Sequence, residues 1–103
     1  MLRYKTTKLT IPANQSKKET ILTLPAEKKV ILKGFGRTSE SDCLSFIEIE
    51  GDRIVEIPCE FAINQGNFIP LEIEVAGPKS VEVGGEDVGG YDHTIYMTLA
   101  YEE

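Results

Sequence analysis

Apolar and polar residues alternate along most of this sequence, and this alternation constrains the fold more than any other feature. Leu71, Ile73 and Val75 fall on one side of an extended chain, and Glu72 and Glu74 fall on the other. A period of two residues is typical of a half-buried antiparallel strand. In a helix, the two glutamates would interrupt any apolar stripe. This segment therefore predicts a β-strand.

The same alternation recurs in short segments that are separated by turn residues, and no segment reads as a helix longer than one turn. Gly51 and Asp52 predict a two-residue hairpin turn. About eight short strands in 103 residues predict one all-β domain over 1–103, a jelly-roll-like, two-layer antiparallel β-sandwich. The predicted strands are 8–11, 22–24, 30–36, 44–50, 53–57, 69–75, 81–83 and 94–101.

Charge is distributed unevenly along the chain. The net charge of −6 argues against nucleic acid as a partner, because binding to phosphates depends on basic side chains. Residues 1–37 contain nine basic and two acidic residues, whereas residues 38–103 contain two basic and fifteen acidic ones. This asymmetry has two interpretations: ion pairs between strands of one sheet, or a basic face of one copy against an acidic face of the next. Lysines on edge strands would also discourage uncontrolled strand pairing; these are Lys5, Lys8, Lys17 and Lys18.

The N-terminal segment Met1 to Lys5 carries charges where a signal peptide needs an apolar run. No segment approaches the roughly 18 apolar residues that cross a bilayer as a helix. We therefore expect no signal peptide, no transmembrane segment and no membrane partner.

The two cysteines, Cys43 and Cys59, stand 16 positions apart, which fits neither a CxxC redox motif nor a metal-ligand pair. Each lies near the end of a predicted strand, so antiparallel neighbours could bring the two thiols together. Buried free thiols are the commoner state in a cytosolic protein. The spacing therefore allows either a disulfide or two free thiols.

Residues 84–93 contain four glycines, three carboxylates and the only histidine of the chain. A loop rich in oxygen ligands could bind Ca²⁺, but the segment has neither EF-hand spacing nor a His-x-x-His spacing. We interpret it as a wide, flexible loop with a possible role in partner or ligand contact. No metal or other cofactor is predicted. The candidate contact residues are Glu86, Asp87, Tyr91, Asp92, His93 and Tyr96.

Nucleophilic catalysis would require a base beside a nucleophile. The single histidine could be paired only with Ser39, Ser41 or Cys43, and no nucleophile-elbow motif surrounds any of these residues. Most carboxylates alternate with apolar residues, as solvated strand faces do. We therefore expect no catalytic residue and no enzymatic activity.

Three segments resemble the small jelly-roll accessory proteins of viruses, such as capsid decoration or stabilising proteins of phages and archaeal viruses. The resemblance implies a non-enzymatic virion protein that forms homo-oligomers and binds capsid or other virion proteins, located in the virion or in the cytoplasm of the host cell. The alternative is a small ligand-binding module for carbohydrate, using residues 84–93 and the nearby tyrosines. The resembling segments are Leu9-Thr10-Ile11-Pro12-Ala13, Gly66-Asn67-Phe68-Ile69-Pro70-Leu71 and Ile95-Tyr96-Met97-Thr98-Leu99-Ala100-Tyr101.

Overall fold

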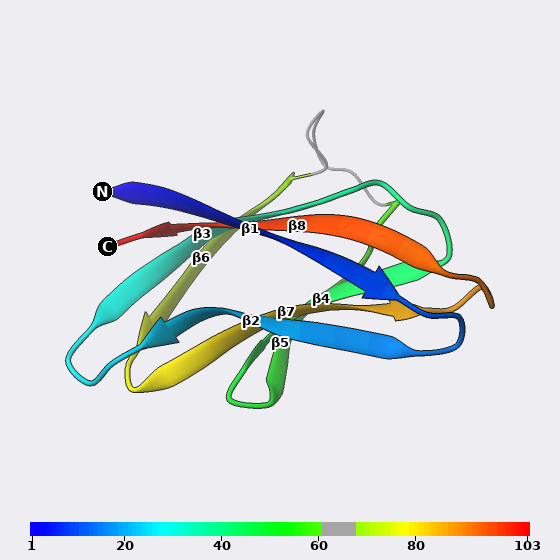
Figure 1. Cartoon of the computed structure of the whole chain (residues 1–103). Coiled ribbons are helices and arrows are strands. Elements are labelled where there is room, and N and C mark those ends of the chain that lie inside the picture. Colours follow the sequence, from blue (N-terminus) through cyan, green and yellow to red (C-terminus); the bar gives the residue numbers. More distant parts are fainter. Residues whose placement is uncertain (61–67) are drawn as a thin grey trace.

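Eight antiparallel strands form two four-stranded sheets in the computed structural model, which describes residues 1–60 and 68–103 (Figure 1). One sheet has the strand order β1-β8-β3-β6, and the other has the order β2-β7-β4-β5. The strands are β1 (Leu2–Ile11), β2 (Ser16–Leu24), β3 (Lys29–Arg37), β4 (Cys43–Ile49), β5 (Asp52–Pro58), β6 (Phe68–Ala76), β7 (Lys79–Asp87) and β8 (His93–Glu102). Eight strands in two packed sheets are the arrangement of a jelly roll. The predicted all-β sandwich is confirmed.

The described residues form no helix, and therefore no helix that could span a membrane. The first two residues of the resembling segment 66–71 lie outside the described residues.

The alternation of the sequence places one row of apolar side chains from each strand between the two sheets. Val83 of β7 and Leu99 of β8 are fully buried there. In β6, Val75 is buried, while Leu71 and Ile73 are half-buried and pack against the same core. Because β6 is an edge strand, no other described strand lies on its outer side to cover these two residues. The predicted inward face of this segment is confirmed.

The hairpin turn between β4 and β5 lies one residue earlier than the sequence predicted. Its two turn residues are Glu50 and Gly51, with φ angles of 50° and 85°, and Ile49 pairs with Asp52. Two positive φ angles are typical of a type I′ hairpin turn. The strain at Glu50 is offset by tertiary contacts, because its Oε1 accepts a hydrogen bond of 2.9 Å from the backbone N–H of Ser80. The prediction of a Gly51-Asp52 turn was therefore wrong.

The glycines at 84 and 85 belong to strand β7 and not to a loop. The ring of Phe46 covers Gly84, and Ile11 from the opposite sheet approaches Gly85. A Cβ atom added at either glycine would lie 2.3 Å from one of these side chains. These glycines allow close packing, and only residues 88–92 connect β7 to β8. The prediction of a wide, flexible loop over 84–93 was wrong, because Gly84 and Gly85 are tightly packed within strand β7 and do not make this segment flexible.

Ion pairs between neighbouring strands account for much of the uneven charge. Lys29 of β3 lies 3.6 Å from Glu74 of β6, and Lys33 of β3 pairs with Glu72 of β6. Lys18 of β2 bridges carboxylates on β4 and β7. Strands from the basic part of the chain therefore lie beside strands from its acidic part, as the first interpretation of the asymmetry expected.

Candidate functional site

The six residues predicted for partner or ligand contact do not form one surface. Asp87 and His93 are buried. Tyr91 and Asp92 lie in the exposed β7–β8 connection. Glu86 and Tyr96 lie on the outer faces of different sheets.

Asp87 organises the end of the sandwich at which β7 leads into β8. Its Oδ1 accepts hydrogen bonds from the Gly89 N–H (3.0 Å) and lies 2.7 Å from Nε2 of His93. Its Oδ2 accepts from the N–H groups of Asn14 (2.6 Å) and Gly90 (2.9 Å). The N–H of Asn14 above all, followed by Gly89, His93 and Gly90, holds the pKa of Asp87 well below its ordinary value, although burial opposes this shift. Asp87, which is only 7% exposed, is therefore a buried carboxylate whose two oxygens are both hydrogen-bonded.

His93 lies between two carboxylates. Its Nδ1 lies 2.8 Å from Oε1 of Glu40, and its Nε2 faces Asp87. Burial is the strongest influence and opposes the charged imidazole, but the hydrogen bonds to Glu40 and Asp87 outweigh it and raise the pKa of His93. Both ring nitrogens thus contact carboxylate oxygens, and not the side chains suggested as nucleophiles, Ser39, Ser41 and Cys43.

Three connections between strands meet at this buried cluster. Asn14 belongs to the β1–β2 connection, Glu40 to the β3–β4 connection, and Gly89 to the β7–β8 connection. The four groups that contact the Asp87 carboxylate are three backbone N–H groups and one ring nitrogen. Its two oxygens therefore face hydrogen-bond donors, and this arrangement does not suit a cation. Within the described part of the chain, no three metal-ligating side chains form a site. The cluster is suited to holding the three connections together.

The outer faces of the two sheets differ in chemistry. On the β2-β7-β4-β5 sheet, the guanidinium of Arg53 lies 3.9 Å from the ring centroid of Phe46 and pairs with Glu56 at 2.6 Å. Charged side chains therefore cover the aromatic residue of this face. On the β1-β8-β3-β6 sheet, the side chains of Tyr4 and Tyr96 stand in solvent, with exposed fractions of 63% and 54%.

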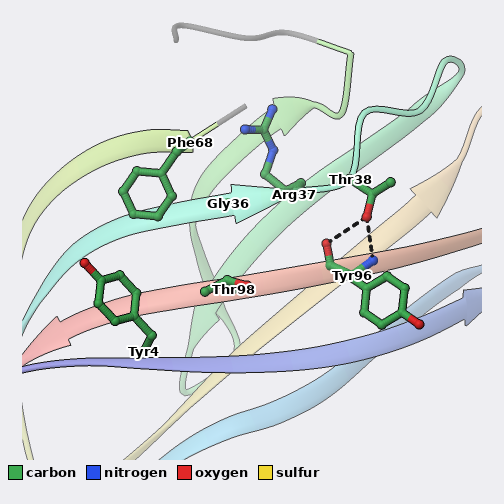
Figure 2. A pocket seen from close by; sticks show the side chains of 7 residues that line it. All are labelled: Tyr4, Gly36, Arg37, Thr38, Phe68, Tyr96 and Thr98. Carbon is green, nitrogen blue, oxygen red and sulfur yellow. Dashed lines mark hydrogen bonds between the residues drawn. The ribbon is translucent and has the colours of Figure 1, made fainter. Parts of the chain in front are cut away.

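A hollow of about 420 Å³ lies on this tyrosine-bearing face (Figure 2). Figure 2 shows Tyr4 and Phe68 at one end, Tyr96 at the other, and Gly36 between them. The missing side chain at Gly36 leaves room for the Phe68 ring, which lies 3.0 Å from the position of a Cβ there. The lining residues are Tyr4, Gly36, Arg37, Thr38, Phe68, Tyr96 and Thr98.

Arg37 connects the two sheets beside this hollow, and sequence reasoning did not single it out. Its Nε donates to Oγ of Ser45 (3.1 Å), and its Nη2 donates to the carbonyl of Pro58 (2.8 Å). The residue is only 4% exposed, and burial lowers its pKa. The alternation could have indicated this position, because Arg37 follows Phe35 on the inward face of β3.

The edge strands of each sheet carry opposite net charges. In the first sheet, β1 has three basic and no acidic residues, while β6 has Glu72 and Glu74 and no basic residue. In the second sheet, β2 has two lysines and one glutamate, and β5 has two carboxylates and one arginine. Strand β1 lies against β2 across the sandwich. The β1/β2 edge is therefore basic, and the two far edges, β6 and β5, are acidic.

Comparison with known proteins identifies a fold and no family. No family model matches the chain, and no curated protein matches its sequence. Among solved structures, the chain is similar to a chain of Sulfolobus Turreted Icosahedral Virus, with a TM-score of 0.69, 13% identity, and coverage of 99% of this chain and 29% of that one. The chain thus spans less than a third of that viral chain.

Two further structures show how widely the fold is shared. A chain of the cyanophage Pam1 capsid has a TM-score of 0.52 at 12% identity, with 99% of this chain and 83% of that chain covered. PliG of Aeromonas hydrophila, a periplasmic lysozyme inhibitor, has a TM-score of 0.51 at 8% identity, with 96% and 84% covered. Since capsid and non-capsid proteins share this fold, the likeness by itself selects no function.

Proposed function

We propose that this chain is a non-enzymatic structural protein that assembles with copies of itself, as a component or accessory of a virion. The observation that carries the proposal is the opposite charge of the edge strands, basic β1 and acidic β6 in one sheet, and β2 and β5 in the other. The likeness in fold to chains of an archaeal virus and a phage capsid supports the virion setting.

The strand order suits a head-to-tail contact between copies. Successive strands in the β1-β8-β3-β6 sheet are antiparallel, and their number is even, so β1 and β6 run in opposite directions. When β6 of one copy is placed beside β1 of the next, the two strands are therefore antiparallel and can extend the hydrogen-bonded ladder. The same holds for β2 and β5 in the other sheet.

Charge favours this contact over a two-fold one. Two β1 edges would bring the lysines Lys5 and Lys8 of one copy close to the same lysines of the other, and two β6 edges would bring Glu72 and Glu74 together. A β1 edge against a β6 edge joins opposite charges instead. Such a head-to-tail contact closes into a ring or continues as a filament, depending on the rotation between copies.

Apolar surface at the acidic edges adds to the charge. Leu71 and Ile73 of β6, and Val55 and Ile57 of β5, are only partly buried in the single chain. A neighbouring copy would remove this surface from water, which favours association. Charge then selects the partner edge, while burial stabilises the contact.

The charge reversal Lys5→Glu with Lys8→Glu is expected to weaken self-association about tenfold, because both edges of the sheet become acidic. The wild-type protein is expected to show masses above the 11.4 kDa of one chain at low salt, and smaller masses as salt screens the contact. Light scattering over a range of protein and salt concentrations measures both effects.

Mixing experiments supply the control for this prediction. Glu72→Lys with Glu74→Lys makes the β6 edge basic and is expected to weaken association as well. An equimolar mixture of the two double variants joins opposite charges again and restores association. The single change Lys79→Glu, on an inner strand, is the matched control that leaves association intact. A wild-type protein that stays monomeric at every salt and protein concentration contradicts the proposal.

The hollow on the tyrosine face favours a second candidate function, carbohydrate binding. Its size falls within the range of small-ligand sites, and its aromatic rings offer the apolar faces on which sugar rings pack. In this alternative, Tyr96→Ala weakens binding about tenfold, and Tyr91→Ala, in the β7–β8 connection and outside the lining of the hollow, leaves it unchanged. A glycan array identifies the ligand, and an array without any bound glycan eliminates this alternative.

A further inference from the structure

Cys43 begins β4, and Cys59 directly follows the end of the neighbouring strand β5. Leu44 of β4 pairs with Pro58 of β5, so Cys43 and Cys59 form the next position of the same ladder. The N–H of Cys59 donates to the carbonyl of Cys43 at 2.8 Å. Neither residue forms a disulfide, and their exposed fractions are 2% and 0%. Of the two outcomes that the sequence allowed, the structure therefore has free, buried thiols.

This position fits the dimensions of a disulfide. Opposite residues that share a backbone hydrogen bond in an antiparallel pair have Cα atoms about 5.5 Å apart, within the range that disulfides span. Cys43 and Cys59 both belong to the core between the sheets, so their side chains point to the same side of the β4–β5 pair. The thiols are also hydrogen-bonded to each other. The backbone hydrogen bond and the shared side of the sheet therefore place the two cysteines suitably for a bond between their sulfurs.

The surroundings make the two sulfurs unequal. The hydrogen bond from Cys43 is the main influence that lowers the pKa of Cys59, and Ser45, Arg37 and His93 act in the same direction against burial. The pKa of Cys43 is raised, because it holds the proton that the pair shares and is itself buried. These influences favour deprotonation of Cys59 over Cys43, and the thiolate is the reactive form of cysteine.

We propose that Cys43 and Cys59 are a redox-modification site that closes to an intrachain disulfide when the protein meets a small disulfide such as oxidised glutathione. The thiolate of Cys59 attacks one glutathione sulfur, the glutathione disulfide breaks, and one glutathione thiolate leaves. Cys43 then gives up its proton and attacks the Cys59 sulfur, releasing the second glutathione. The two cysteines are oxidised, the glutathione disulfide is reduced, and both protons end on the released glutathione thiols.

Access to the buried pair comes through the edge of the sheet. Among the described strands, β5 pairs with β4 alone, so its end at Pro58 can separate locally once the hydrogen bond from Arg37 to the Pro58 carbonyl breaks, without loss of a second strand pair. Once closed, the bond joins the outer ends of the β4–β5 hairpin. It therefore stabilises the edge strand that is otherwise held on one side alone. The argument for this site does not rest on the proposed self-association, although β5 is one of the edges that the association would use.

The test is to incubate the full chain with oxidised glutathione and to measure its intact mass, its free thiols after unfolding, and its melting temperature. We expect a mass lower by two hydrogen atoms, no free thiols, and a melting temperature higher by about 10 °C, all reversed by dithiothreitol. Wild-type protein that keeps both thiols free, even after refolding with oxidised glutathione, overturns the proposal. A crosslinked dimer, or a closed form that melts below the reduced form, also overturns it.

Single variants separate closure from simple modification. Cys43→Ala leaves Cys59 without a resolving partner and is expected to gain the mass of one glutathione without any rise in melting temperature. Cys59→Ala removes the attacking sulfur and is expected to react more slowly. Should either variant fail to fold, the mass and thiol content of the wild-type protein still decide the question. Equal rates of modification in the two variants would contradict the assigned order of attack.

Discussion

Replacing Asp87 with alanine is expected to lower the melting temperature of the protein by more than about 10 °C. The change removes the acceptor for the N–H groups of Asn14, Gly89 and Gly90. It also leaves His93 buried with one of its two carboxylates missing. Partly buried N–H groups without an acceptor and a buried charge without its partner are both costly. Thermal unfolding followed by circular dichroism measures the effect.

Two further variants show whether the loss belongs to the buried cluster. Asp92→Ala removes an exposed carboxylate that accepts one hydrogen bond, from the N–H of Ala13, and should lower the melting temperature only slightly. Asp87→Asn keeps one oxygen acceptor, replaces the other with an NH2 group and loses the charge, so its loss should fall between the other two. Equal melting temperatures for Asp87→Ala and Asp92→Ala would show that the cluster contributes little to stability.

The same cluster makes stability depend on pH. The pKa of His93 is raised by Glu40 and Asp87, so its contribution is complete below about pH 6.5 and is lost as the pH rises through the raised pKa. The pKa of Asp87 is lowered, so its contribution is present above about pH 4 and is lost in stronger acid. In Asp87→Ala, urea unfolding between pH 6 and pH 9 should therefore show a weaker dependence on pH than in the wild type.

Replacing Gly84 with alanine is expected to destabilise the protein by about 3 kcal/mol, the upper end of the range for overpacking. The new Cβ would lie 2.3 Å from Cζ of Phe46 and 2.6 Å from the carbonyl oxygen of Lys17. The Phe46 ring cannot simply turn away, because it is buried beneath the guanidinium of Arg53. The backbone oxygen belongs to strand β2 and cannot move without disturbing its pairing with β7. Urea unfolding measures the loss.

Gly36→Ala is the matched control for this change. It also adds a methyl group to a strand beneath an aromatic ring, but its closest contact is 3.0 Å, with the Phe68 ring. Its expected loss is therefore smaller. In the double variant Gly84→Ala with Phe46→Leu, removal of the ring relieves part of the conflict, so the losses should be less than additive. A Gly84→Ala protein as stable as Gly36→Ala would show that β7 shifts easily.

Fold class followed from the sequence because strand periodicity is a local property. Residues 71–75 show their buried face within five positions, and β8 shows its own in the same way. Each strand carries this alternation in its own residues, regardless of which strands pair with it. The turn after β4 was misplaced by one residue because Glu50 adopts a positive φ with the help of Ser80, a residue from a different strand.

The candidate site was much less predictable, since its parts come from distant positions. The sequence identified the segment 84–93 as unusual, but not the partners that give it structure. Asn14 lies 73 positions from Asp87, and Glu40 lies 53 positions from His93. The hollow likewise joins Tyr4 and Phe68, which belong to opposite edge strands of one sheet. No pattern within a short segment of sequence indicates which distant residues come into contact.

By itself, then, the sequence determined that the chain is all β, which side of most strands is buried, and that basic and acidic residues separate along its length. Only the tertiary structure decided which strands are edges, that Gly84 and Gly85 serve packing, and that Cys43 meets Cys59. The physical reason is that side-chain direction along a strand is set by its own backbone, whereas the pairing of strands depends on contacts across the whole chain.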